Sequence, residues 1–136
     1  MRATTLTLLV AAVLAGCGGP IRSEELGRSV QALESSAAEG ALLAQDVARD
    51  RTKSTFARAH SRDVSETVDH EAEKLEDASA NGGLVVAKAR AVSLAGAISQ
   101  ALGDLQTAPD SEDAGRRAGA TLTRLAGRAG RLAEGL

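Results

Sequence analysis

Two histidines and the carboxylates near them are the side chains of this sequence best suited to bind a metal ion. Glu66 and His70 are four residues apart, about one helical turn, and imidazole and carboxylate groups are common transition-metal ligands. His60 and His70 are ten residues apart, about 15 Å along a helix axis, so one ion cannot easily take both from a single helix. We therefore predict no bound metal. We interpret His60 as a partly buried side chain, beside Phe56 on the inward face of its helix and hydrogen-bonded to a carbonyl.

The stretch 39–75, which contains these candidate ligands, resembles exported ferritin-like helical bundles of unassigned function. The resemblance implies an alternative function, that of a small metal-handling bundle that would use His60, Glu66 and His70. A di-iron site of that fold needs a Glu from each of two helices and a Glu-x-x-His from each of the other two. This sequence contains no Glu-x-x-His. We therefore expect neither a di-metal centre nor any other cofactor.

Serine residues near the histidines do not form a recognisable catalytic pattern. Ser61 and Ser65 lie in ordinary helical sequence, without the strand-to-helix turn that exposes a nucleophilic serine or a recognisable oxyanion partner. We predict that the protein is not an enzyme.

Cys17, the only cysteine of the chain, follows an apolar N-terminal stretch. Arg2 precedes the run 6–14, which is apolar apart from one threonine, and glycines and Pro20 end it. The run is much shorter than the ~20 residues that cross a bilayer, so the pattern predicts a secretory signal and not a membrane-spanning helix. A lone cysteine also excludes an intramolecular disulfide.

Leu14-Ala15-Gly16-Cys17 resembles the lipobox of bacterial lipoproteins. This resemblance implies cleavage of residues 1–16, acylation of Cys17, and a lipidated tether over residues 17–22. Two or three acyl chains give a stable anchor, at ~0.8 kcal/mol per buried methylene. Gly18 in the second mature position implies the outer membrane if the cell has one. The alternatives are a soluble secreted protein and an apolar cytosolic leader.

Composition limits the classes of partner. Removal of residues 1–16 from the 136 leaves 120, enough for one small domain. The formal net charge is −2, which argues against a nucleic-acid binder driven by positive charge. Phe56 is the only aromatic residue, so stacking on bases and aromatic cation cages are excluded.

Apolar periodicity predicts an all-α, alanine-rich domain over residues 23–136. We expect an antiparallel four-helix bundle in up-down-up-down order, because the helices are of similar length and their connections are short. An alternative is that the first two helices fuse into one long arm, since residues 50–54 contain neither Gly nor Pro. The predicted helices are 23–49, 55–80, 84–105 and 112–134.

Spacings of three and four residues predict the side of each helix that faces the core. The seam of the first helix is Leu26, Val30, Leu33, Ala37, Gly40, Ala44 and Val47. That of the second is Phe56, His60, Val64, Thr67, Val68, Glu71, Leu75 and Ala78. The third has Leu84, Ala91, Ala95, Ile98, Leu102 and Leu105, and the fourth has Ala118, Leu122, Leu125, Ala129, Leu132 and Leu136.

Basic residues concentrate in the last helix as Arg116, Arg117, Arg124, Arg128 and Arg131. Residues 21–80 carry 8 basic and 13 acidic side chains, whereas residues 84–136 carry 7 and 5. The stripe is a possible binding surface for anionic lipid, an acidic envelope polymer or an acidic protein. The alternative we favour is that these arginines face the acidic second helix within the bundle. The glycines of the last helix lower its intrinsic stability, so it should depend on close docking.

These features predict a membrane-anchored lipoprotein of the bacterial envelope, on the extracytoplasmic side. We expect it to act as a non-enzymatic helical module that binds another envelope component or spaces one from the membrane. Sustained 3.5-residue seams also allow self-association as a coiled coil, and the sequence leaves the oligomeric state open.

Overall fold

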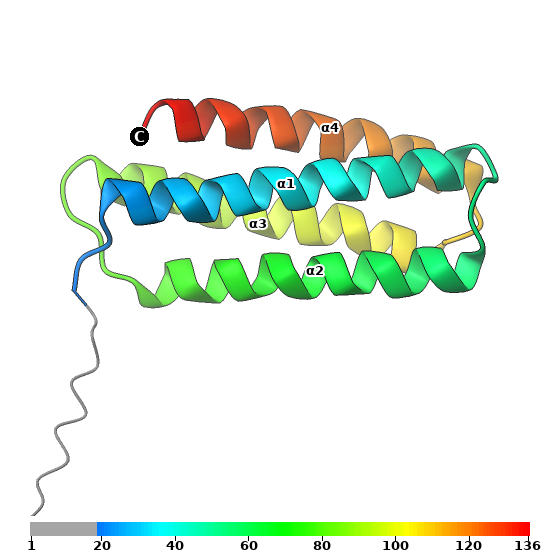
Figure 1. Cartoon of the computed structure of the whole chain (residues 1–136), viewed down its shortest axis with the longest axis horizontal. Coiled ribbons are helices and arrows are strands. Elements are labelled where there is room, and N and C mark those ends of the chain that lie inside the picture. Colours follow the sequence, from blue (N-terminus) through cyan, green and yellow to red (C-terminus); the bar gives the residue numbers. More distant parts are fainter. Residues whose placement is uncertain (1–18) are drawn as a thin grey trace, which may run out of the picture.

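The computed structural model describes residues 19–136, which form the four helices α1 (Ser23–Ala48), α2 (Ser54–Asp77), α3 (Leu84–Thr107) and α4 (Glu112–Glu134). Consecutive helices run in opposite directions and are joined by short loops (Figure 1). The predicted all-α four-helix bundle is confirmed, and every observed helix end lies within three residues of its predicted position. The predicted signal sequence and Cys17 lie outside the described residues.

The segment between α1 and α2 is a turn, so the alternative of one continuous arm is wrong. Asp50 has a φ of 53°, in the left-handed region that aspartate tolerates better than most side chains. The Asp50 amide donates to Val47 O (3.1 Å), and the Arg51 amide donates to Asp46 O (2.8 Å). A left-handed aspartate therefore ends α1 without Gly or Pro. The N-cap of α2 is Lys53, which makes no side-chain capping bond.

The N-terminus of α4 is capped by a serine side chain. Ser111 Oγ accepts a hydrogen bond from the Ala114 amide (3.2 Å), and acidic residues occupy the first turn. At the start of α1, Glu25 Oε2 accepts from the Arg22 amide (3.2 Å). This backbone hydrogen bond lowers the pKa of Glu25, because it stabilises the ionised carboxyl. Both helix starts thus satisfy a backbone donor with a side-chain oxygen.

The core is formed by the apolar seams of α1, α3 and α4, largely as predicted. All seven predicted positions of α1 are buried, and the α3 and α4 seams are buried through their middle turns. Leu84, Leu132 and Leu136 are half-buried because they lie at one end of the bundle. The fully buried large side chains of these three helices include Leu26, Leu33, Ile98, Leu102, Leu105 and Leu122.

The predicted inward face of α2 is partly wrong. Phe56 is 56% exposed and points away from the core, and Thr67 is exposed as well. Position 57 is rotated by about 100° from position 56, so a seam displaced by one residue buries a different stripe. The buried residues of α2 are Ala57, Ser61, Val64, Val68 and Leu75. Small side chains therefore replace the phenylalanine in the first turns of the core.

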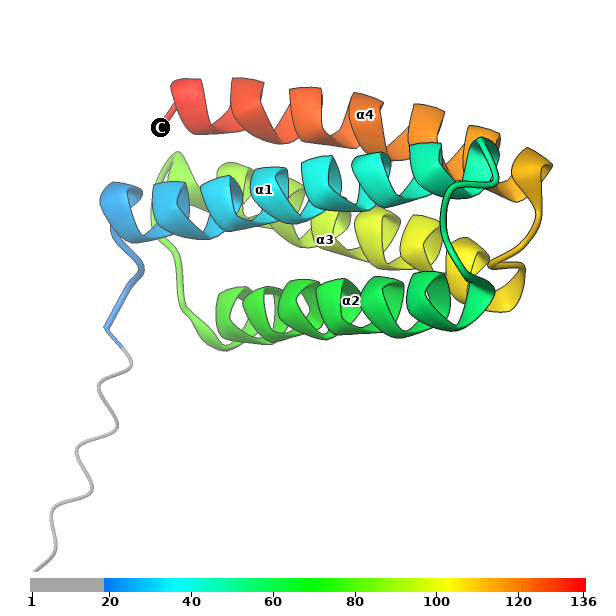
Figure 2. The same cartoon turned by 45° about the vertical axis from the view of Figure 1, so that its right-hand side comes forward.

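The bundle is wider along one diagonal than along the other. α1 and α3 contact each other across the centre, whereas α2 and α4 do not contact (Figure 2). Gly40 of α1 makes this possible, because a methyl group there would lie 2.7 Å from Leu102 Cδ2 and 3.1 Å from Leu122 Cδ1. α1 and α4 pack most closely, with Gly115 against the backbone of Ala44 and Ala48. The predicted dependence of α4 on close docking agrees with this contact.

Among the described helices, α3 alone is long and apolar enough to cross a membrane, by length and composition only. A core helix of a bundle has the same property. In this fold Ala91, Ile98 and Leu102 of α3 face the other three helices and are buried. The apolar character of α3 is thus at least partly explained by the core.

Ser29 is a buried polar residue whose hydroxyl has no hydrogen-bond partner among the described residues. We expect Ser29→Ala to stabilise the protein by about 1 kcal/mol, because it removes an unsatisfied buried group and favours the helix. Urea unfolding followed by circular dichroism measures the change. Ser61→Ala is the control, since the equally buried Ser61 hydroxyl donates to Arg58 O (3.1 Å). A loss of stability in the Ser29 variant would contradict the prediction.

Candidate functional site

The arginines of α4 are all exposed, as a binding surface requires. Arg116 is compensated locally, because its guanidinium contacts the carboxylates of Glu112 (3.5 Å) and Asp113. The hydrogen bond to Asp113 raises the pKa of Arg116. Within residues 19–136, the three arginines nearer the C-terminus of α4 form no ion pair with an acidic side chain. These three are Arg124, Arg128 and Arg131.

The prediction that these arginines face α2 is wrong. α2 lies diagonally opposite α4, with α1 and α3 between them (Figure 2). In an up-down-up-down bundle the second and fourth helices lie on a diagonal. Here α1 and α3 meet across the other diagonal, which keeps α2 and α4 apart. Charge on α4 is therefore free to act on something outside the bundle.

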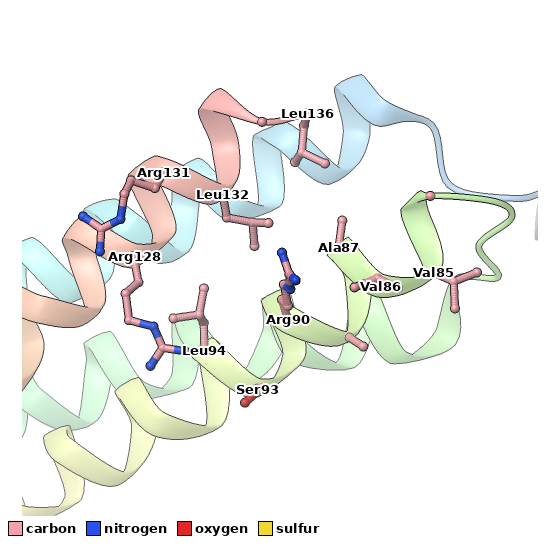
Figure 3. Close-up of a pocket in the computed structure, with 13 residues that line it drawn as sticks. Val85, Val86, Ala87, Arg90, Ser93, Leu94, Arg128, Arg131, Leu132 and Leu136 are labelled. Carbon is pink, nitrogen blue, oxygen red and sulfur yellow. The ribbon is translucent and has the colours of Figure 1, made fainter.

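A groove of about 920 Å³ opens between the first turns of α3 and the last turns of α4. Leu94 of α3 and Leu132 of α4 project into it from opposite sides (Figure 3). Arg90 and Arg128 reach into the same gap from the two helices (Figure 3). The described residues that line it include no aspartate or glutamate. The other lining residues are Gly83, Val85, Val86, Ala87, Ala89, Ser93, Arg131, Gly135 and Leu136.

A second groove of about 760 Å³ lies beside the first along the same pair of helices. It shares Arg128 and Arg131 with the first groove and adds Arg124. Small side chains such as Ala97 and Ala101, together with Gly127, leave the α3/α4 seam shallow here. Its one acidic lining residue is Asp104. We call the two depressions together the α3/α4 groove.

The N-terminal segment joins the bundle at the end where the first depression lies. The Ile21 amide donates to Ser79 O (2.8 Å) of the α2–α3 loop, and the Ile21 side chain is buried. Ser23 Oγ donates to Leu136 O (2.5 Å). The start of α1, the α2–α3 loop and the end of α4 therefore share one end of the molecule (Figure 1).

His60 bonds to a carboxylate, not to the predicted carbonyl. Its Nε2 lies 2.9 Å from Glu39 Oε1 of α1, and its side chain is 34% exposed. The imidazole stacks on Phe56, with 5.4 Å between ring centroids and 13° between ring planes. The pair lies at the surface because Phe56 is turned out of the core. His60 thus links α1 to α2.

The other candidate metal ligands do not join His60. Glu66 Oε1 accepts a hydrogen bond from Arg62 Nε (3.1 Å), and His70 is exposed. Glu71, half-buried, lies 3.5 Å from Lys74 Nζ. Over residues 19–136, no three side chains of His, Cys, Asp or Glu lie close enough to hold a metal ion.

Several residues of the groove were missed by the prediction from sequence, among them Arg90, Val85 and Val86. Arg90 lies on the otherwise apolar α3, while Val85 and Val86 are 50% and 56% exposed. The exposure of both valines could have been predicted, because neither belongs to the predicted seam of that helix and apolar residues outside a seam face outward. The pairing of Arg90 with the α4 arginines depended on which helices are neighbours.

Comparison with known proteins adds no relative: no protein-family model, no curated protein and no solved structure matches this chain.

Proposed function

We propose that the protein is a bacterial envelope lipoprotein, anchored through Cys17 on the extracytoplasmic side of a membrane. In this proposal the helical bundle is a non-enzymatic module that presents the α3/α4 groove at the membrane surface and binds an anionic component of the envelope. Gly18 after the acylated cysteine favours the outer membrane in a cell that has two. The lipobox-like run Leu14-Ala15-Gly16-Cys17 supports the anchoring part.

The proposed binding of an anionic component is supported by the position of the basic groove, which lies at the end of the bundle where the N-terminal segment begins. Ile21 is fixed to the α2–α3 loop by its bond to Ser79 O, at the end where Val85, Arg90 and Leu132 line the groove. Ile21 is four positions after Cys17, and four extended residue steps span at most about 14 Å. An acylated Cys17 would therefore hold this end of the bundle close to the lipid headgroups.

Charge supports an anionic partner. The whole chain has a formal net charge of −2, so attraction to an anion has to come from a local excess of positive charge. Arg124, Arg128 and Arg131 supply that excess on one face, with Arg90 across the groove. At physiological salt such attraction extends about 8 Å, which suits contact with a surface already held near by a tether.

The metal-handling alternative has no observation in its favour within the described residues. His60 is bonded to Glu39, and Glu66 is bonded to Arg62. Elemental analysis of protein purified without chelators tests this alternative directly. One equivalent of bound metal per chain would favour the metal-handling function over the proposed one.

The mass of the full chain, expressed in a bacterium and extracted from its membranes with detergent, tests the anchor. We expect residues 17–136 carrying a diacylglycerol, with or without a further acyl group on the amino terminus. An unmodified chain in the soluble fraction would overturn the proposal.

Binding to a polyanion tests the second part of the proposal. The purified protein is placed in phosphatidylcholine vesicles and mixed with dextran sulfate, a soluble polyanion. Binding at low salt that disappears at high salt is expected, and no binding at low salt would contradict the anionic partner.

A further inference from the structure

The α3/α4 groove combines an apolar floor with basic walls, which is the chemistry that receives an anionic amphiphile. Leu94, Leu132 and Leu136 supply apolar surface, while Arg90 and Arg128 reach into the groove from its two sides (Figure 3). We propose that this groove binds one molecule of an anionic phospholipid from the membrane in which the chain is anchored. One acyl chain lies between α3 and α4, and the phosphate is held by the arginines. This inference rests on the proposed function, because it names the anionic component.

Charge complementarity is the first argument for this occupant. The first depression is lined by three arginines and no acidic side chain, and Arg128 and Arg131 form no ion pair within residues 19–136. A guanidinium presents several N–H donors in a plane and can bind two oxygens of one phosphate at once. Arg90 and Arg128 extend from opposite helices, so together they can hold a phosphate from two sides. A lipid with no net charge would supply no net negative charge to balance these guanidinium groups.

The dimensions of the groove are the second argument. Its first depression, about 920 Å³, is within the range of small-molecule sites. From Gly83 to Leu94 the α3 helix extends about 17 Å, at ~1.5 Å per residue. One leaflet of hydrocarbon is about 15 Å thick, half of a 30 Å bilayer core. The length of this stretch therefore matches that of a single acyl chain.

The position of exposed apolar residues is the third argument. Val85 and Val86 are exposed in the first turn of α3, beside the loop to which Ile21 is bonded. With Cys17 in the membrane, these valines meet the lipid surface and form the mouth of the groove. An acyl chain can then enter from the leaflet without crossing water. The exposed Leu42 of α1 lines no part of this groove, so exposure of apolar side chains alone does not define the entrance.

A phospholipid fits this groove better than the other anionic partners considered. An acidic polysaccharide has no acyl chain to bury against the apolar floor. Among the described residues that line the groove, no aromatic ring is present to stack on a sugar. The acyl chains on Cys17 itself are uncharged near their attachment and would not engage Arg90 or Arg128. Free phosphate would engage the arginines but leave the half-buried Leu132 and the exposed Val85 and Val86 in contact with water, which is why the tail contributes to binding.

Titration of the full chain in neutral detergent micelles tests the proposal. The probe is phosphatidylglycerol, with phosphatidylcholine and glycerol phosphate as comparison probes, and binding is measured by native mass spectrometry and by methyl NMR. We expect saturable binding of one phosphatidylglycerol, with shifts at Val86, Leu94 and Leu132 and none at Leu42. Equal binding of phosphatidylcholine would overturn recognition of charge. Full competition by glycerol phosphate would overturn the role of the acyl chain.

Two double variants localise the site. We expect Arg90→Gln with Arg128→Gln to weaken phosphatidylglycerol binding about tenfold or more, because both walls lose charged donors. The control, Arg116→Gln with Arg117→Gln, removes the same charge from the other end of α4 and should change binding less than about twofold. All four arginines are exposed, and circular dichroism checks that both variants fold. Equal losses in the two variants, or no loss in the first, would overturn the site.

The phosphatidylglycerol titration and the test of Cys17 acylation can fail independently of each other. Micelles supply the lipid whether or not Cys17 is acylated, so the titration has its own outcome. Acylated protein that binds no phosphatidylglycerol contradicts the groove and leaves the anchor standing. Unacylated protein that binds it contradicts the anchor and leaves the groove standing.

Discussion

Replacement of Cys17 by serine is expected to abolish acylation of the protein and to release it from the membrane. A serine hydroxyl cannot form the thioether that the lipobox resemblance implies, so the diacylglycerol is lost. Each acyl chain contributes ~0.8 kcal/mol per buried methylene, and a protein held by one chain binds only marginally. Incorporation of labelled palmitate into the full chain measures the change. We expect it to fall to background, because no other cysteine is present in the sequence.

A matched control separates the position of the thiol from its presence. Cys17→Ser combined with Ser35→Cys returns one cysteine to the chain, on the exposed surface of α1. We expect this double variant to remain unlabelled, since Ser35 follows no lipobox. Labelling of the single variant at the wild-type level would contradict acylation at Cys17. Labelling of the double variant alone would indicate modification of any accessible thiol.

The sequence predicted the parts of the fold that depend on local spacing. Seven apolar or small residues at spacings of three and four define the buried side of α1, and all seven are buried. α2 differed because the prediction placed its largest apolar residue inward. Phe56 lies outside, and Ala57 and Ser61 face the core. Periodicity in a sequence with few large apolar residues allows two faces that are 100° apart, and only packing distinguishes them.

The candidate site was half predictable, for a reason of topology. The α4 arginines were identified from charge alone, and they are exposed. Their supposed pairing with α2 conflicted with the predicted bundle itself, in which the second and fourth helices lie on a diagonal. Once α3 is recognised as a neighbour of α4, Arg90 and the two exposed valines become visible as parts of the same groove. The depth of that groove depends on side-chain packing, which residue spacing and charge alone do not reveal.

Gly115→Ala is expected to destabilise the protein by about 1–3 kcal/mol, although alanine favours helix. A methyl group at position 115 would lie 2.6 Å from Ala48 N and 2.8 Å from Ala44 O, so α1 and α4 must move apart. Overpacking of this kind costs about 1–3 kcal/mol, and the ~1 kcal/mol that alanine contributes to helix stability offsets it only in part. Urea unfolding followed by circular dichroism measures the free energy of unfolding.

Gly127→Ala is the control, in the same helix and with the same change in helix propensity. Position 127 is exposed. Among residues 19–136, apart from the adjacent backbone of its own helix, a methyl group there would meet only Arg131 Nη1, at 3.5 Å, an ordinary contact. We expect this variant to be more stable than the wild type by about 0.5–1 kcal/mol. The two substitutions should therefore change stability in opposite directions, because only the methyl group at position 115 would clash with the backbone of α1. If both variants were stabilised alike, the close approach of α1 and α4 at Gly115 would be wrong, and the neighbour relations that place the groove between α3 and α4 would need revision.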